Sequence, residues 1–164
     1  MIVKEIVVED FLQYKKPCMF ILMPYCSFKC EKECGIEGIC QNSPLAKTKT
    51  IDIPISTIID LYVNNDITKA ICFGGLEPLD SFDELLNFII NFRYNHDDLI
   101  VIYTGYKEEE IQDKLDILKL YENIIIKFGR FIPNQEHHTD KLLGVELASP
   151  NQYARWISDY QVEP

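Results

Sequence analysis

A chain of 164 residues, 47% of them apolar, can bury the core of one compact domain and is too short for two ordinary ones. Its formal net charge of -10 argues against a nucleic-acid partner, because nucleic-acid binders usually present a basic face. The sequence has no apolar run of membrane-spanning length, and its first residues lack the pattern of a signal peptide. We therefore expect a cytoplasmic protein without a membrane partner.

The chain begins with two segments typical of β-strands, at residues 2–8 and 18–23. Four of the six cysteines follow in the stretch 26–40, which begins where the second strand ends. A helix is predicted at residues 57–64, whose first and fourth residues have the spacing of a capping box.

The middle of the chain continues this alternation of strand and helix. Strands are predicted at residues 70–73 and 99–103. A helix is predicted at residues 81–92, which open on a second capping-box pattern. A further amphipathic helix is predicted at residues 108–120, where an acidic first turn suits the helix dipole.

Two more strands are predicted at residues 123–128 and 142–147. Residues 149–152 then supply the serine, proline and glutamine that favour a helix start, so a terminal helix is expected. Apolar strands that alternate with amphipathic helices indicate a single α/β domain over residues 1–164. Its parallel sheet is either doubly wound or curled into a barrel.

In both of these folds, functional residues gather at the carboxyl ends of the strands. Several polar or glycine-containing segments come directly after a predicted strand. They are the cysteine stretch, Gly74 with Gly75, Thr104 with Gly105, Gly129 with Arg130, and Ser149. We expect these segments to share one rim of the sheet, where paired glycines would leave the backbone open to a ligand.

The stretch 26–40 is dense in thiols and charges, which core packing does not explain, because a buried cysteine normally sits among apolar neighbours. In a reducing compartment, such a cluster favours metal binding over disulfides. Thiolates are the usual ligands of iron-sulfur clusters, and four-thiolate sites also bind structural zinc. Cys18 and Cys72 lie in apolar strands and are expected in the core.

Two motifs in this chain resemble those of radical S-adenosylmethionine enzymes. They are Cys26-x3-Cys30 followed by further cysteines, and a strand that ends in Gly74-Gly75-Leu76-Glu77-Pro78. More narrowly, residues 103–106, 127–131 and 149–152 look like segments of the activating proteins of anaerobic ribonucleotide reductase. The resemblance covers residues 17–155. It implies an incomplete (β/α) barrel of about six strands, whose open side would admit a glycine-bearing loop of a large protein substrate.

The resemblance also implies a chemistry. In this family, three cysteines hold a 4Fe-4S cluster, and S-adenosylmethionine binds the iron that lacks a protein ligand. An electron from a donor such as flavodoxin or ferredoxin then cleaves S-adenosylmethionine to a 5'-deoxyadenosyl radical. This radical takes a hydrogen atom from a glycine of the partner, the large subunit of anaerobic ribonucleotide reductase.

The resemblance assigns Cys26 and Cys30 as the first two cluster ligands in a cluster-binding loop over residues 26–40. The third ligand is either Cys34 or Cys40. Spacing favours Cys34, whereas the neighbours of Cys40 are more similar to those in the activating proteins. We therefore prefer Cys40, with residues 31–39 as an insertion.

By the same resemblance, S-adenosylmethionine contacts fall on Gly74, Gly75, Glu77, Pro78, Thr104 and Asn151. Glu77 would meet the amine of the methionine moiety, although Leu76 is inserted into the usual Gly-Gly-Glu-Pro pattern. No catalytic residue is expected beyond the cluster and its bound S-adenosylmethionine.

Four further polar residues remain open in role. Lys127 and Arg130 are candidates for contacts to a carboxylate or to a partner, with surface salt bridges as the alternative. His137 and His138 lie in a polar loop and favour solvation over metal binding. Two alternative functions also stay open: radical modification of another protein or small molecule, and a non-catalytic, zinc-stabilised binding module.

Overall fold

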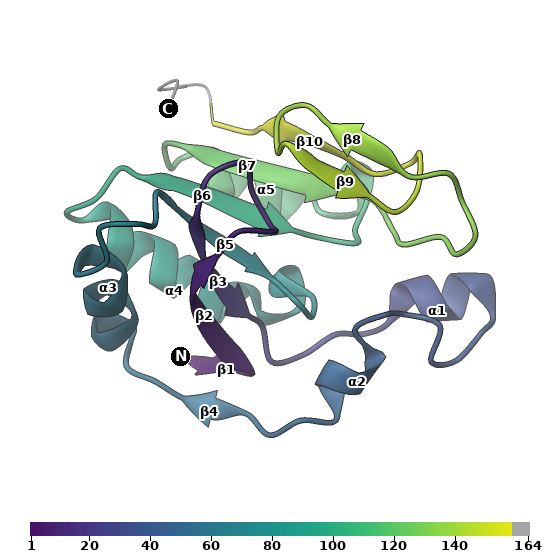
Figure 1. Ribbon diagram of the computed structural model, residues 1–164, viewed down its shortest axis with the longest axis horizontal. Coiled ribbons are helices and arrows are strands. Elements are labelled where there is room, and N and C mark those ends of the chain that lie inside the picture. Colours follow the sequence, from purple (N-terminus) through teal and green to yellow (C-terminus); the bar gives the residue numbers. More distant parts are fainter. Residues whose placement is uncertain (159–164) are drawn as a thin grey trace.

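The computed structural model describes residues 1–158, and six strands form one mixed sheet in the order β10-β7-β6-β5-β3-β2 (Figure 1). The parallel strands in its middle are β3 (Cys18–Leu22), β5 (Ala70–Gly74), β6 (Leu99–Tyr103) and β7 (Ile124–Phe128). The antiparallel strands at its two ends are β2 (Glu5–Asp10) and β10 (Tyr153–Trp156). Because the sheet ends at β2 and β10, it is not closed, and the predicted α/β fold with an incomplete barrel of mostly parallel strands is confirmed.

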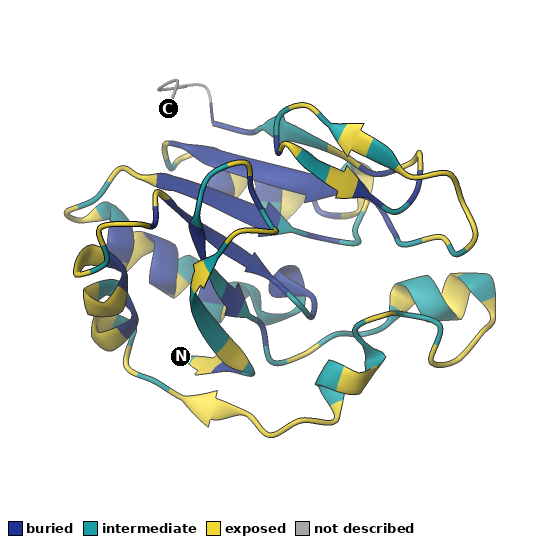
Figure 2. Ribbon diagram, viewed as in Figure 1, coloured by how far each residue is buried: buried dark blue, intermediate teal, exposed yellow. Residues whose placement is uncertain are grey.

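Three helices pack on one face of this sheet: α3 (Ile55–Val63), α4 (Phe82–Arg93) and α5 (Gln112–Leu118). Successive strand residues point to opposite faces, and the set that includes Phe73 of β5 packs against these helices. Phe73 meets Phe88 of α4 edge to face, with ring centroids 5.2 Å apart. The strands β5 and β7 are buried along their whole length, which explains their continuous apolar sequences (Figure 2).

The other face of the sheet is covered by residues 11–16 and by a hairpin of β8 (His138–Asp140) and β9 (Val145–Leu147). Tyr14 and Leu143 from these two segments pack against strand residues of this face. Cys18 and Cys72 are fully buried in the same cluster, as expected for core residues.

Several short elements complete the fold. The strands β1 (Ile2–Val3) and β4 (Ile51–Asp52) form a separate antiparallel pair. The helices α1 (Lys29–Cys34) and α2 (Ser43–Ala46) lie on the connection from β3 to β4 (Figure 1). The 3-10 helices η1 (Pro78–Ser81) and η2 (Glu108–Glu110) precede α4 and α5. Within residues 1–158, none of the helices combines the length and the apolar character that crossing a membrane requires.

Both predicted capping boxes are wrong. The helix α3 begins two residues before Thr57, directly after Pro54, so Thr57 lies inside its first turn. Ser81 makes no capping hydrogen bond, because it already ends the 3-10 helix η1. The carboxylate of Glu77 caps that 3-10 helix, accepting a hydrogen bond from the N–H of Leu79.

The predicted helix at residues 108–120 is divided. Its first turn is the 3-10 helix η2, and α5 begins only at Gln112 and ends at Leu118. Ile111 lies between them with a φ of -135°, outside the helical range, while its side chain is buried in the core. The apolar spacing of this segment therefore predicted the buried face correctly and the helix length incorrectly.

The predicted terminal helix is wrong, because the chain turns at residues 149–151 and then forms β10. Tyr153 pairs with Phe128 at the free edge of β7, where an unpaired strand would expose its backbone groups. Gln152 does not cap a helix; its side-chain oxygen accepts a hydrogen bond from the N–H of Ala148. Only residues 145–147 of the predicted strand 142–147 are extended, and they pair with β8 outside the main sheet.

Truncation of the ring at the centre of the helix–sheet interface should destabilise the protein. We expect Phe88→Ala to lower the free energy of unfolding by ~3–5 kcal/mol, because it leaves a cavity under Phe73. Ile90→Ala on the same helix is the matched control, since this side chain is 48% exposed, and it should cost under ~1 kcal/mol. Urea denaturation followed by circular dichroism measures both, and equal losses would contradict this description of the core.

Candidate metal and cofactor site

A cavity of about 490 Å³ lies where the parallel strands end, a volume typical of small-molecule sites. It is lined by residues from four of the five segments of the predicted rim, and Ser149 is not among them. Of the residues that the sequence assigned to the site, those that line the cavity are Cys26, Cys30, Cys40, Gly75, Glu77 and Thr104. The remaining four, Cys34, Gly74, Pro78 and Asn151, are not among the residues that line it.

Three thiols share one wall of this cavity. Cys26 follows β3, Cys30 lies on α1, and Cys40 lies in the turn after α1. The interaction between the thiols of Cys30 and Cys40 lowers the pKa of Cys40 and raises the pKa of Cys30, because the two groups share one proton most readily as a pair. Burial raises the pKa of Cys26 to about 11. Among residues 1–158, no three His, Cys, Asp or Glu side chains stand ready to hold a single metal ion.

Backbone N–H groups already point at two of these sulfurs. The N–H of Phe28 donates to Cys26 Sγ over 3.2 Å, and the N–H of Asn42 donates to Cys40 Sγ over 3.4 Å. Phe28 has a φ of 51°, which is uncommon for a bulky residue, and it begins α1. Hydrogen bonds of this kind stabilise thiolates and tune the potential of iron-sulfur clusters.

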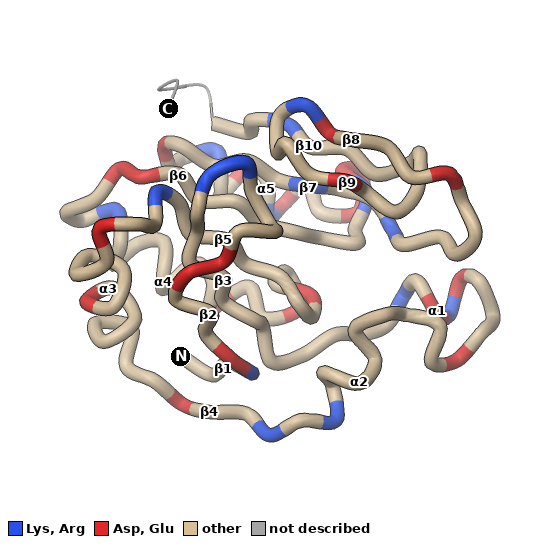
Figure 3. The backbone as a smooth tube through the Cα atoms, viewed as in Figure 1, with Lys and Arg blue, Asp and Glu red and all other residues tan. Residues whose placement is uncertain are grey.

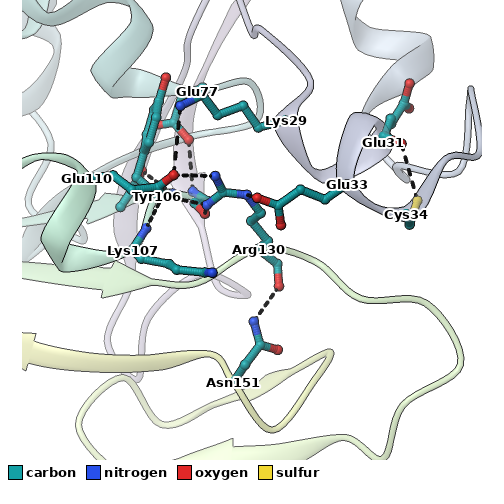
Figure 4. A network of polar contacts seen from close by, with 12 residues as sticks. Lys29, Glu31, Glu33, Cys34, Glu77, Tyr106, Lys107, Glu110, Arg130 and Asn151 are labelled. Carbon is teal, nitrogen blue, oxygen red and sulfur yellow. Dashed lines mark hydrogen bonds and ion pairs between the residues drawn. The ribbon is translucent and has the colours of Figure 1, made fainter.

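Cys34 has different surroundings. Its sulfur lies 3.5 Å from the carbonyl oxygen of Glu31, on the part of α1 that does not line the cavity (Figure 4). The carboxylate of Glu31 instead accepts hydrogen bonds from Ser43 Oγ and, over 3.2 Å, from the N–H of Cys40. Sequence reasoning missed this residue, which ties Cys40 to the helix that carries Cys30. An acid one position after a cysteine gives no local signal of such a contact.

Glu77 is the buried acid of the cavity. Its Oε1 accepts from Thr104 Oγ1 over 2.8 Å, its Oε2 accepts from the N–H of Gly105 over 2.8 Å, and Leu79 supplies a third donor. These contacts join the ends of β5 and β6. Burial raises the pKa of Glu77 to about 7, although the three donors favour the carboxylate.

Lys127 is the buried base of the cavity, at the end of β7. Its Nζ donates to the carbonyl oxygen of Gly129 over 3.1 Å, and no carboxylate of the described residues forms an ion pair with it. Burial lowers the pKa of Lys127 to about 8, with Glu77 and Cys30 acting in the opposite direction. The alternative of a surface salt bridge is therefore wrong for Lys127, which is buried.

The glycines and the distal residues have structural roles in this rim. Gly75 has a φ of 75°, and a Cβ there would lie 2.9 Å from the side chain of Leu45. Asn151 donates to the carbonyl oxygen of Arg130 over 2.9 Å, which anchors the turn before β10 (Figure 4). His137 lines the cavity and lies 2.8 Å from a carboxylate oxygen of Glu146, whereas His138 belongs to β8.

Three thiols that line a cavity at the carboxyl ends of parallel strands are typical of the class of proteins that hold a metal cluster. Residues 17–152 match the family described as 4Fe-4S single cluster domain, which spans most of the chain. The chain belongs to this family of iron-sulfur proteins. No curated protein and no solved structure matched the chain.

The donor set agrees with this family. Cys26, Cys30 and Cys40 are soft thiol ligands on one wall, and the N–H groups directed at their sulfurs suit thiolates bound to iron. These three residues would hold the cluster, and Cys34 lies outside the cavity.

The burial of Glu77 predicts a pH dependence in the metal-free chain. Its pKa is about 7 in the folded state, above its ordinary value of 4.5, so the folded state binds more protons between these values. Stability should therefore fall as the pH rises from 4.5 to 7, by up to ~3 kcal/mol. Urea denaturation across this range should show that Glu77→Gln removes the fall and that Glu109→Gln, at an exposed position, keeps it. An unchanged profile in Glu77→Gln would contradict this reading of the cavity.

Proposed function

We propose that this protein is a radical S-adenosylmethionine enzyme that installs a glycyl radical on anaerobic ribonucleotide reductase. The observation that carries the proposal is that Cys26, Cys30, Cys40 and Glu77 line one cavity at the carboxyl ends of parallel strands. The family match supports the cluster, and the resemblance of residues 103–106, 127–131 and 149–152 to the activating proteins supports the reductase as partner.

In this proposal, Cys26, Cys30 and Cys40 each bind one iron of the cluster. Three thiols lie on this wall, which would leave one iron for the amino and carboxylate groups of S-adenosylmethionine. When bound and reduced, such a cluster supplies the electron that cleaves S-adenosylmethionine to methionine and a 5'-deoxyadenosyl radical. The task of the chain is to place the cosubstrate and to keep water away from it.

The charges of the cavity suit the methionine end of S-adenosylmethionine. Glu77 would accept a hydrogen bond from the amine of this ligand. The Thr104 hydroxyl and the Gly105 N–H would hold the Glu77 carboxylate in place for that contact. The Lys127 ammonium, which forms no ion pair with a carboxylate of residues 1–158, would meet the carboxylate of the same ligand. Thr104 therefore acts in this proposal by orienting Glu77.

A protein substrate requires that the cavity be reachable from outside. Leu12 lines the cavity and is 76% exposed, so the cavity opens beside residues 11–16. Phe11 is also exposed there, and exposed apolar residues often mark contacts with another protein. A glycine-bearing loop of the reductase would approach through this opening. We also propose a cytoplasmic location, where the thiols stay reduced and flavodoxin or ferredoxin can donate the electron.

Metal analysis and spectroscopy of protein purified without oxygen test the enzyme. We expect about four iron and four sulfide per chain, and a reduced-state paramagnetic signal that changes when S-adenosylmethionine is added. With reductant and the reductase, the protein should then form 5'-deoxyadenosine and a glycyl radical. Stoichiometric zinc, without sulfide and without a signal, would instead support a zinc-stabilised binding module. Cleavage of S-adenosylmethionine without a glycyl radical would point to a different substrate.

Single substitutions test the third ligand. Cys40→Ala should abolish a stable four-iron cluster, because it removes a thiol from the cavity wall. Cys34→Ala should retain the iron and sulfide of the wild type, because its sulfur lies outside that wall. Iron and sulfide per chain after reconstitution measure both. The opposite pattern would make Cys34 the ligand, and retention of the cluster by both variants would overturn the assignment of this loop.

A further inference from the structure

The helix that carries Cys30 is attached to the rest of the protein by charged side chains. None of the residues of α1 is buried, and Figure 2 shows this helix in the colours of intermediate and exposed residues. In Figure 1 it lies at the side of the molecule, away from the layer of helices that packs on the sheet. Apolar packing therefore contributes little to where Cys30 lies, and polar contacts have to fix it.

Arg130 is at the centre of these contacts (Figure 4). It follows β7, and its side chain is only 5% exposed. Its two terminal nitrogens each donate to the carboxylate of Glu110 over 2.6 Å, and Nη1 also donates to the carbonyl oxygen of Gly105 over 3.1 Å. Its Nε lies 2.8 Å from a carboxylate oxygen of Glu33 on α1, an ion pair without the alignment of a hydrogen bond. One guanidinium thus joins α1 to the ends of β6 and β7.

Lys29 provides a second attachment of α1, beside the one that Glu33 makes with Arg130. Lys29 and Glu33 are one helical turn apart, so they lie on the same side of α1. The Nζ of Lys29 is 3.9 Å from Glu110 and 4.5 Å from the ring centre of Tyr106. Figure 3 shows basic and acidic residues close together on α1. Both attachments therefore reach residues that follow β6.

The geometry distinguishes this network from an ordinary surface salt bridge. An exposed ion pair usually adds little stability, because water and salt screen it. Arg130 is almost fully buried and contacts two carboxylates and a carbonyl oxygen at once. These three contacts together fix the position of its guanidinium. Lysine has one ammonium in place of the planar guanidinium and cannot reproduce these directions together.

We propose that Arg130 is a positioning residue for the cluster site, which acts through Glu33 to fix α1, and with it Cys30, against the cavity. The proposal rests on the proposed function in that Cys30 is taken as a cluster ligand. It goes beyond that function by assigning the alignment of the thiol wall to an ion-pair network. A preorganised ligand set binds its metal group with less reordering of the chain.

Trypsin offers a readout, because cleavage after Lys29 and Lys32 requires local unfolding of α1, which loss of its contacts with the rest of the protein favours. In the full-length, metal-free chain, Glu33→Gln and Arg130→Gln should raise the rate of cleavage at these lysines about tenfold. Arg130→Lys should give an intermediate rate. Glu37→Gln is the matched control, since it removes an exposed acid of the same loop that makes no contact with Arg130. High salt should accelerate cleavage of the wild type more than cleavage of Glu33→Gln, which keeps, of the two attachments of α1, only the Lys29–Glu110 ion pair.

The reconstituted protein gives a second readout. The same variants should lose iron to a chelator in the same order of rates, and the paramagnetic signal of the reduced cluster should change in shape relative to Glu37→Gln. Wild-type cleavage and iron-loss rates in Glu33→Gln would overturn the proposal. This variant also covers the case in which Arg130→Gln does not fold, because the Glu33 side chain is 54% exposed and outside the core. Trypsin cleavage involves no S-adenosylmethionine. The role of Arg130 can therefore still be tested if the protein proves not to cleave S-adenosylmethionine.

Discussion

The parallel pairing of β3, β5, β6 and β7 is the constraint on which the site depends. Its register sets Leu22 beside Gly74 and Tyr103 beside Lys127, so the strands end at one level. Parallel strands need long crossover connections, and the helices in these connections occupy one face of the sheet. The other face is then free for residues 11–16 and the β8–β9 hairpin, which supply the opposite wall of the cavity. The pairing therefore brings segments that are far apart in the sequence to the same rim.

The cavity concentrates two charges that burial disfavours. The three donors to Glu77 offset part of its desolvation, whereas among the described residues Lys127 donates to one carbonyl oxygen, that of Gly129. Both pKa values are consequently displaced toward the neutral forms. A ligand with an ammonium near Glu77 and a carboxylate near Lys127 would favour the charged form of each, because an opposite charge nearby stabilises ionisation. We infer that the same burial that destabilises the ligand-free chain favours a zwitterionic ligand.

The sequence predicts the parts of this structure that depend on local or repeated signals. The central strands are continuous apolar runs, so the sheet, its buried faces and the rim of Glu77 and Thr104 follow from pattern. The capping patterns and residues 149–152 mislead, because a turn satisfies the same polar groups as a helix start. Residues 153–156 form a strand because they pair with the free edge of β7. That edge is distant in the sequence, so the local sequence around these residues gives no sign of it. Likewise, only the folded structure distinguishes Cys40, which lines the cavity, from Cys34, which does not.

The cysteines themselves divide by the way they are held. Cys26 lies four residues after the end of β3, on the connection that leaves the sheet. Cys30 and Cys40 belong to a segment that contributes no residue to the core, and two of its three acids, Glu31 and Glu33, hold it in place. Glu31 acts within the segment, since it binds the N–H of Cys40, whereas Glu33 acts outward, since it binds Arg130. The internal shape of the segment and its attachment to the sheet therefore rest on different side chains.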